Sequence, residues 1–206
     1  MLKSIQPINN TTTLSVSGPE NRDTFWRDWD QYAGRISALR HSGLKFSMRK
    51  LAGDSYAVSM TRQPMSDLSI LKDLPITELT LTDCKVADLS PIRDLRLTRL
   101  NLRANPISDV SALRGMPLEK LDLSETAVSD LTPLQDLPLK TLDLRKCATL
   151  SDLRSLHGMS LENLDLRETA VSDIAPLNGL PLKSLDFSGC SQLTDLDGLA
   201  EAPALE

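Results

Sequence analysis

The sequence predicts an α/β solenoid, with a parallel β-sheet on one face, short 3₁₀ turns on the other and an N-terminal helix/hairpin cap. The first observation is a repeated phrase such as V-S-D-L, which opens a unit at Met65, Val86, Ile107, Val128, Leu150, Val171 and Leu193. The second is the spacing between these openings, which is 21 or 22 residues each time. A fixed period of that length indicates a solenoid, in which each unit buries its core only against its neighbours.

A second phrase, midway through each unit, predicts the strand. Six units share the frame L-x-x-L-x-L-x-x-[N/C/T], as in L-E-K-L-D-L-S-E-T from Leu118 to Thr126. Two leucines two residues apart point to the same face of a strand. Leu79 and Leu81 are therefore expected in the core, and Thr80 between them is expected at the surface.

The segment that returns from one strand to the next is short. Val128 to Pro138 spans eleven residues, too few for a full helix with two turns, and a single 3₁₀ turn fits instead. Thr132-Pro133 and Ser90-Pro91 predict an N-cap followed by proline at the first helical position.

The repeated frame resembles the leucine-rich repeat, and the resemblance covers Val58 to the C-terminus, about seventy per cent of the chain. The short unit is similar to the internalin type of bacteria. The variant D-L-x-P-L-x-x-[LM]-P-L is also similar to repeats of environmental bacterial proteins, some of them fused to Ser/Thr kinases. The resemblance implies that partners bind to the exposed strand face.

The chain is expected to divide into three parts. Residues 1–17 are predicted to be a tail or linker, 18–57 an N-terminal helical/hairpin cap, and 58–206 a leucine-rich repeat array of about seven units. The first strand of the array is expected at Val58 to Thr61. The last unit opens at Leu193 and stops before its strand, and an apolar terminal unit needs a cap. The chain is therefore expected to be a fragment, or to self-associate through this incomplete C-terminal repeat.

The predicted cap contains an apolar stripe at steps of three and four residues, which indicates one face of an amphipathic helix. The stripe comprises Phe25, Trp29, Tyr32, Ile36 and Leu39. Lys45 to Leu51 and Tyr56 to Thr61 flank a turn and predict a hairpin whose second strand continues into the repeat sheet. The alternative to a cap is a partner-binding helix that exposes Trp26 and Trp29.

Composition argues against several classes of function. The net charge is −5, and the absence of a basic stripe disfavours nucleic acid and anionic membranes as partners. No segment approaches the roughly 20 apolar residues that span a bilayer. The sequence contains no P-loop, G-x-S-x-G, kinase or zinc motif, so it predicts no enzyme activity, no cofactor and no metal. A cytoplasmic location is expected, because no signal-peptide pattern is present and the thiols are predicted to be reduced.

The cysteines and one row of aspartates are interpreted as structural. Cys84, Cys147 and Cys190 occupy the frame position that Asn105, Thr126 and Thr169 fill in other units, which predicts an inward ladder of small buried side chains. An aspartate recurs in each opening phrase, at Asp67, Asp88, Asp109, Asp130, Asp152, Asp173 and Asp195. Turn-capping is favoured for this row over calcium binding, because no glycine-rich calcium loop accompanies it.

The outward strand positions supply the candidate partner-binding residues: Arg99, Arg103, Asp122, Asp143, Arg145, Asp165 and Arg167. One interpretation is a solvated face on which Asp and Arg rows satisfy each other between strands. The other is a polar docking surface centred on the arginines, since arginine is enriched in the energetic centres of interfaces. Both interpretations stay open at this stage.

The sequence therefore predicts a non-catalytic protein–protein interaction module that binds a protein partner through the exposed strand face. One alternative is a recognition or regulatory domain of a larger bacterial enzyme, such as a Ser/Thr kinase. The other is an internalin-like adhesin.

Overall fold

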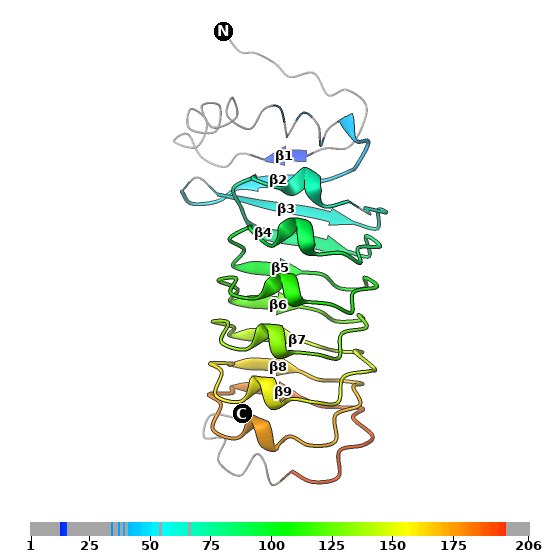
Figure 1. Cartoon of the computed structure of the whole chain (residues 1–206), viewed down its shortest axis with the longest axis vertical. Coiled ribbons are helices and arrows are strands. Elements are labelled where there is room, and N and C mark those ends of the chain that lie inside the picture. Colours follow the sequence, from blue (N-terminus) through cyan, green and yellow to red (C-terminus); the bar gives the residue numbers. More distant parts are fainter. Residues whose placement is uncertain are drawn as a thin grey trace.

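The computed structural model describes residues 41–196 except 54 and 66, together with residues 34, 37 and 39 and the backbone of 13–15. The described strands form one stack (Figure 1). They are β1 (Thr13–Ser15), β2 (Ser47–Lys50), β3 (Tyr56–Thr61), β4 (Ile76–Thr82), β5 (Arg99–Asn101), β6 (Lys120–Asp122), β7 (Thr141–Asp143), β8 (Asn163–Asp165) and β9 (Ser184–Asp186). The 3₁₀ turns are η1 (Ser69–Leu71), η2 (Ser90–Ile92), η3 (Ser111–Leu113), η4 (Thr132–Leu134), η5 (Arg154–Leu156) and η6 (Ala175–Leu177).

The described strands form a nine-stranded sheet in sequence order. From β3 to β9 every neighbouring pair is parallel, and equivalent frame positions lie opposite each other, as Leu121 does to Leu142. The predicted solenoid, with its parallel sheet and 3₁₀ turns, is confirmed. The stack is possible because each strand leaves N–H and C=O groups that only the next unit can satisfy.

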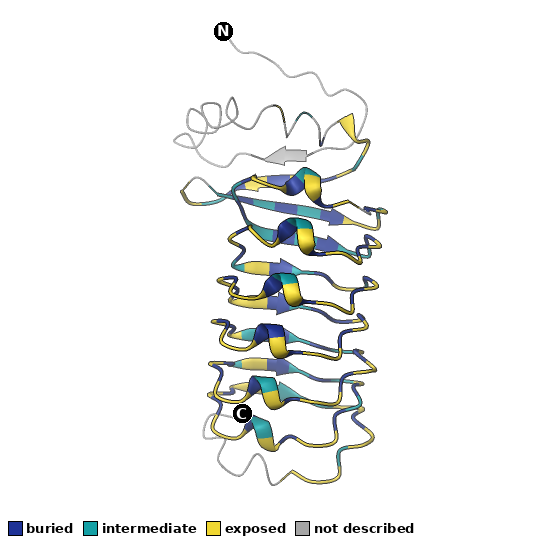
Figure 2. Cartoon of the chain, in the orientation of Figure 1, coloured by how far each residue is buried: buried dark blue, intermediate teal, exposed yellow. Residues whose placement is uncertain are grey.

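The core lies between the sheet and the row of 3₁₀ turns, and every described unit contributes leucines to it (Figure 2). Leu79 and Leu81 are buried and Thr80 is half-buried, as the L-x-L spacing predicts. Each 3₁₀ turn adds a buried residue from the opposite side, such as Leu134 in η4. Short units can bury a core because the units on either side cover each layer of it.

The aspartate row of the opening phrases caps the 3₁₀ turns. Asp109 Oδ1 accepts the Ser111 backbone N–H at 2.8 Å, and the same contact recurs two residues after each of its equivalents, Asp67, Asp88, Asp130, Asp152 and Asp173. The turn-capping interpretation is confirmed for these six. The N-caps expected at Ser90 and Thr132 are wrong, because both are the first residues of their turns and make no side-chain cap of their own. The preceding aspartate satisfies the backbone donor instead.

The inward ladder is also confirmed. The Asn105 amide donates to the carbonyls of Leu81 and Leu102 and accepts the backbone N–H groups of Cys84 and Val86. In neighbouring units the smaller groups contact fewer backbone atoms. The Thr126 hydroxyl donates to the Leu123 carbonyl at 2.6 Å, and the Cys147 thiol donates to the same oxygen at 3.2 Å. All three cysteines are buried free thiols, and burial raises the pKa of Cys84 and Cys147.

A left-handed backbone residue closes each described strand-to-ladder turn. These residues are Arg62, Asp83, Ala104, Glu125, Lys146, Glu168 and Gly189, with φ between 52° and 80°. Six of the seven have side chains that rarely adopt this conformation, and glycine occupies it only in the last unit. The stacking of the units therefore stabilises this backbone conformation, although the side chains at six of the seven positions disfavour it.

The two ends of the array match the expectations only in part. The hairpin is confirmed, since β2 and β3 pair antiparallel and β3 continues into the parallel sheet. Thr13–Ser15 pairs with Ser47–Arg49, so this piece of the segment expected to be a tail belongs to the sheet.

The apolar stripe of the predicted cap is described only at Leu39, which is buried. Outside the described residues lie Phe25, Trp29, Tyr32, Ile36 and the alternative Trp26. Residues 197–206 do too, so the expected self-association through the last repeat is untested.

Acid should weaken the array through the turn-capping aspartates. The Ser69, Ser90 and Ser111 backbone N–H groups lower the pKa of Asp67, Asp88 and Asp109 below 3.8, and the Arg154 side chain lowers that of Asp152 to about 2. Because the folded-state pKa lies below the unfolded one, protonation favours unfolding. We expect the free energy of unfolding, measured in urea, to be constant above about pH 5 and to fall from there to about pH 2.

Asp152→Asn is the control for this acid sensitivity. Asparagine keeps an oxygen that can accept the Arg154 backbone N–H, but it does not titrate in this range. The variant should lose less stability than the native chain between pH 4 and pH 2. An identical acid profile for the two proteins would contradict this account.

Glycine should be tolerated better at the left-handed position than elsewhere. Ala104 has φ 58°, which for a residue with a Cβ is unfavourable by about 1–2 kcal/mol. Ala104→Gly should therefore raise the free energy of unfolding by about 0.5 kcal/mol, after the greater freedom of glycine in the unfolded chain is subtracted. Ala127→Gly, at an exposed position of the adjacent unit without positive φ, should lower it by about 0.5–1 kcal/mol. Equal effects of the two substitutions in urea unfolding would contradict the strain argument.

Candidate functional site

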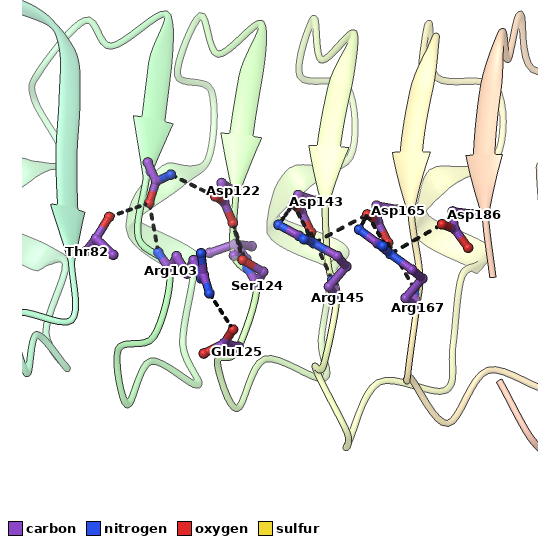
Figure 3. A network of polar contacts seen from close by, with 12 residues as sticks. Thr82, Arg103, Asp122, Ser124, Glu125, Asp143, Arg145, Asp165, Arg167 and Asp186 are labelled. Atoms are coloured by element: carbon purple, nitrogen blue, oxygen red, sulfur yellow. Dashed lines mark hydrogen bonds and ion pairs between the residues drawn. The ribbon is translucent and has the colours of Figure 1, made fainter. Parts of the chain in front are cut away.

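The sheet register arranges the outward side chains of the strands in rows. The Asp row lies on the strands and consists of Asn101, Asp122, Asp143, Asp165 and Asp186, which are direct neighbours in the parallel pairing. The Arg row follows two residues later and consists of Arg103, Ser124, Arg145, Arg167 and Ser188. We call the two rows together the strand face (Figure 3).

Each member of the Asp row is held in place by the backbone that follows it. Asp143 Oδ1 accepts the Arg145 backbone N–H at 3.1 Å, and Asp122 Oδ1 accepts that of Ser124 at 2.9 Å. The same bond forms at Asn101, Asp165 and Asp186. These are Asx-type turns, which reverse the chain as it leaves the strand. The carboxylates are therefore rigid before any partner arrives.

Arg145 and Arg167 each bridge two neighbouring units. Arg145 lies 2.7 Å from Asp143 in its own unit and 3.3 Å from Asp165 in the next. Arg167 repeats this geometry, at 2.7 Å from Asp165 and 3.3 Å from Asp186. Figure 3 shows the resulting chain of alternating carboxylates and guanidiniums along β7, β8 and β9. The guanidiniums separate carboxylates that would otherwise repel one another across the strands.

The N-terminal part of the strand face uses other contacts. The Asn101 amide donates to Asp122 at 2.7 Å and accepts from the Thr82 hydroxyl at 3.2 Å. Arg103 pairs with Glu125 at 2.9 Å, beyond the Asp row. Arg99 lies on the other flank and pairs with Glu78 at 3.2 Å. The structure thus unites Asp143, Arg145, Asp165 and Arg167 in one network and leaves the other three candidates in separate pairs.

The side chains of the strand face remain accessible although they are paired. The exposed fractions are 34% for Arg145, 40% for Arg167 and 47% for Arg103. Ion pairing between the rows, expected for a solvated face, is therefore present, and it leaves the outer edges of the guanidiniums open to a partner. Exposed pairs of this kind contribute little to stability on their own.

The Asp row has a capping role that sequence reasoning missed. The signal was present, because an aspartate followed two residues later by a polar residue occurs in most of the opening phrases and again at the ends of β6 to β9. The two aspartates of a unit cap two different turns by the same contact. Strand periodicity hides this role, since it assigns the aspartate to the outward face and predicts nothing about the turn that follows.

The described residues form neither a cluster of metal ligands nor a helix that could span a membrane. No group of three or more His, Cys, Asp or Glu side chains among them is arranged to hold a metal ion. No helix within this part of the chain has the length and apolar character needed to cross a bilayer.

Comparison with known proteins identifies the type of repeat. No protein-family model matches the chain, and no curated protein matches its sequence. The structure is similar to that of an internalin (inlF) from Listeria monocytogenes, with 30% sequence identity and a TM-score of 0.65 over 74% of this chain. It is also similar to internalin C2 (inlC2) of the same organism, with 28% identity and a TM-score of 0.49 over 63% of this chain and 69% of that one.

The matched region spans 46% of the first internalin, about half of its length. In this chain the strands, the 3₁₀ turns and the inward ladder recur with a period of 21 or 22 residues. The chain is a leucine-rich repeat protein with short repeats of the internalin-like type.

Proposed function

We propose that the chain is a non-catalytic protein-interaction module whose partner docks on the strand face. The observation that carries the proposal is the network of Asp143, Arg145, Asp165 and Arg167, which holds two accessible guanidiniums in fixed positions on a parallel sheet. Side chains that are ordered before binding lose less conformational freedom when a partner arrives. Guanidiniums also offer planar, directional donors to carboxylates and backbone carbonyls.

The character of the surface suits a weak or transient contact. The strand face carries both signs of charge and no aromatic side chain, and aromatic anchors are typical of tight interfaces. Charges at such a surface act mainly on the rate of association and on its dependence on salt. Regulation or reversible recognition therefore fits this face better than permanent assembly.

The likeness to an internalin supports an interaction role and leaves two settings for it. In an adhesin-like role the strand face would bind a protein outside the cell. In a recognition role within a larger bacterial enzyme, such as a Ser/Thr kinase, it would recruit a substrate or regulator. We favour the cytoplasmic setting because the three cysteines are free thiols, which persist in a reducing compartment.

The test is capture of partners from a lysate of the source cell on the immobilised chain. Arg145→Ala/Arg167→Ala should weaken binding of a specifically captured protein by roughly tenfold, because two fixed donors are lost from the centre of the surface. Arg154→Ala is the matched control, since Arg154 pairs with Asp152 two residues earlier just as Arg145 does with Asp143, but on the 3₁₀ side of the array.

The readout is the dissociation constant of the captured protein for each variant, after unfolding in urea has established that both fold. The proposal predicts loss in the double variant and native affinity in the control. It is wrong if both variants bind as the native chain does, or if the control loses as much affinity as the double variant.

A further inference from the structure

The hairpin at the start of the array differs in charge from the repeats that follow it. Residues 41–66 contain four Lys or Arg residues and one acidic residue, whereas residues 67–196 contain 14 basic and 20 acidic ones. The basic residues of the hairpin are Lys45, Arg49, Lys50 and Arg62. The strand sheet is thus positive at its N-terminal end and negative along the repeats.

Two of these cations, Lys45 and Arg62, have no acidic partner among the described residues, whereas Lys50 and Arg49 make other contacts. Lys50 points inward, is buried and lies 6.0 Å from the Tyr56 ring. Arg49 pairs with Glu78, which Arg99 also contacts, so that one carboxylate serves two guanidiniums. Lys45 and Arg62 are both exposed, and no described carboxylate lies within ion-pair distance of either.

Lys45 and Arg62 line the same hollow. Its floor is made by the outward side chains of β2 and β3, Ser47, Ser59 and Thr61, and Gly43 lies at its edge. Ser47 faces Ser59 in the antiparallel pairing, and Ser59 faces Thr80 in the first repeat strand. The short Ser and Thr side chains between the longer Lys45 and Arg62 side chains leave the surface hollow here, whereas the Asp and Arg side chains fill the corresponding face from β7 onward.

The geometry of the hollow is held by backbone and amide contacts. Gln63 bridges the two sides, because its side-chain amide accepts the Lys45 backbone N–H and donates to the Lys45 carbonyl. Arg62 has φ 55° and donates its own backbone N–H to the Thr82 carbonyl. Both cations therefore project from constrained backbone, on the same face of the sheet as the Asp and Arg rows.

We propose that this hollow, lined by Lys45, Arg62, Ser47, Ser59 and Thr61, binds an acidic segment of the partner protein. The proposal rests on the proposed function, because the segment would belong to the partner that docks on the strand face. Two cations that no described carboxylate neutralises attract carboxylates, and the three hydroxyls can donate hydrogen bonds to them. From Asp122 onward the Asp row carries fixed carboxylates, so an acidic segment is attracted more strongly to the hollow than to that row.

The test uses fluorescein-labelled octaglutamate as the probe and the full chain as the protein. Fluorescence anisotropy at about 20 mM ionic strength, where screening is weak, should detect binding that disappears near 0.5 M salt. Lys45→Glu/Arg62→Glu should weaken that binding by roughly tenfold or more, because two attractive charges become repulsive. Arg93→Glu/Arg114→Glu makes the same change of net charge at exposed positions on the 3₁₀ side and should leave affinity within about twofold.

Amide chemical shifts in the native chain localise the probe. The proposal predicts shifts at Lys45, Ser59 and Arg62 on addition of octaglutamate, and none of comparable size with inorganic phosphate at the same charge concentration. Absence of binding at low salt, equal losses in the two charge-reversed variants, or equal shifts with phosphate alone would each overturn it. Because no natural partner is used, these outcomes are independent of whether Arg145→Ala/Arg167→Ala abolishes capture from the lysate.

Discussion

The in-register backbone pairing of successive units is the constraint on which the rest of this structure depends. Leu102, Leu123, Leu144 and Leu166 each donate a backbone hydrogen bond to the residue that ends the strand of the next unit, at 2.7–2.9 Å. Unpaired buried backbone groups are strongly unfavourable, so a unit can neither slip nor rotate without losing these bonds. The left-handed residue of each turn and the inward ladder follow from this pairing. Both return the chain to the position from which its next strand can pair in register.

The same register brings like charges close together and also places the groups that offset their repulsion. Identical frame positions stack at about 4.8 Å, so a conserved period places aspartate beside aspartate. On the 3₁₀ side, Asp88 and Asp130 raise the pKa of Asp109, but the backbone and side-chain hydrogen bonds of Ser111 outweigh them and the net pKa is lowered. On the strand side, Arg145 and Arg167 lie between the carboxylates. Capping and charge alternation therefore make a repetitive acidic chain compatible with close stacking.

These contacts also shape the surface that a partner meets. The alternating network along β7 to β9 is a rigid pattern of both charges, whereas the hydroxyl floor of β2 and β3 carries two cations without described partners. A partner that contacts both regions would need an acidic segment at one end and mixed polarity at the other. The two proposed sites can be disrupted separately, because they lie on different strands and share no ion pair.

Sequence by itself determined the period, the strand and 3₁₀ positions, the inward ladder and the outward rows, because a side chain that faces the core must be apolar or, in the ladder, small and able to hydrogen-bond in every repeat. It placed Asp143, Arg145, Asp165 and Arg167 on one face for the same reason. Only the tertiary structure decided how these residues interact: that Arg145 bridges to Asp165, that Asp143 caps a turn, and that Asp88, not Ser90, caps η2. It also decided that Lys45 and Arg62 share a hollow while Lys50 is buried. Periodicity specifies which face a residue occupies, but the contacts across units depend on the register and on turn geometry, which arise only when the units stack.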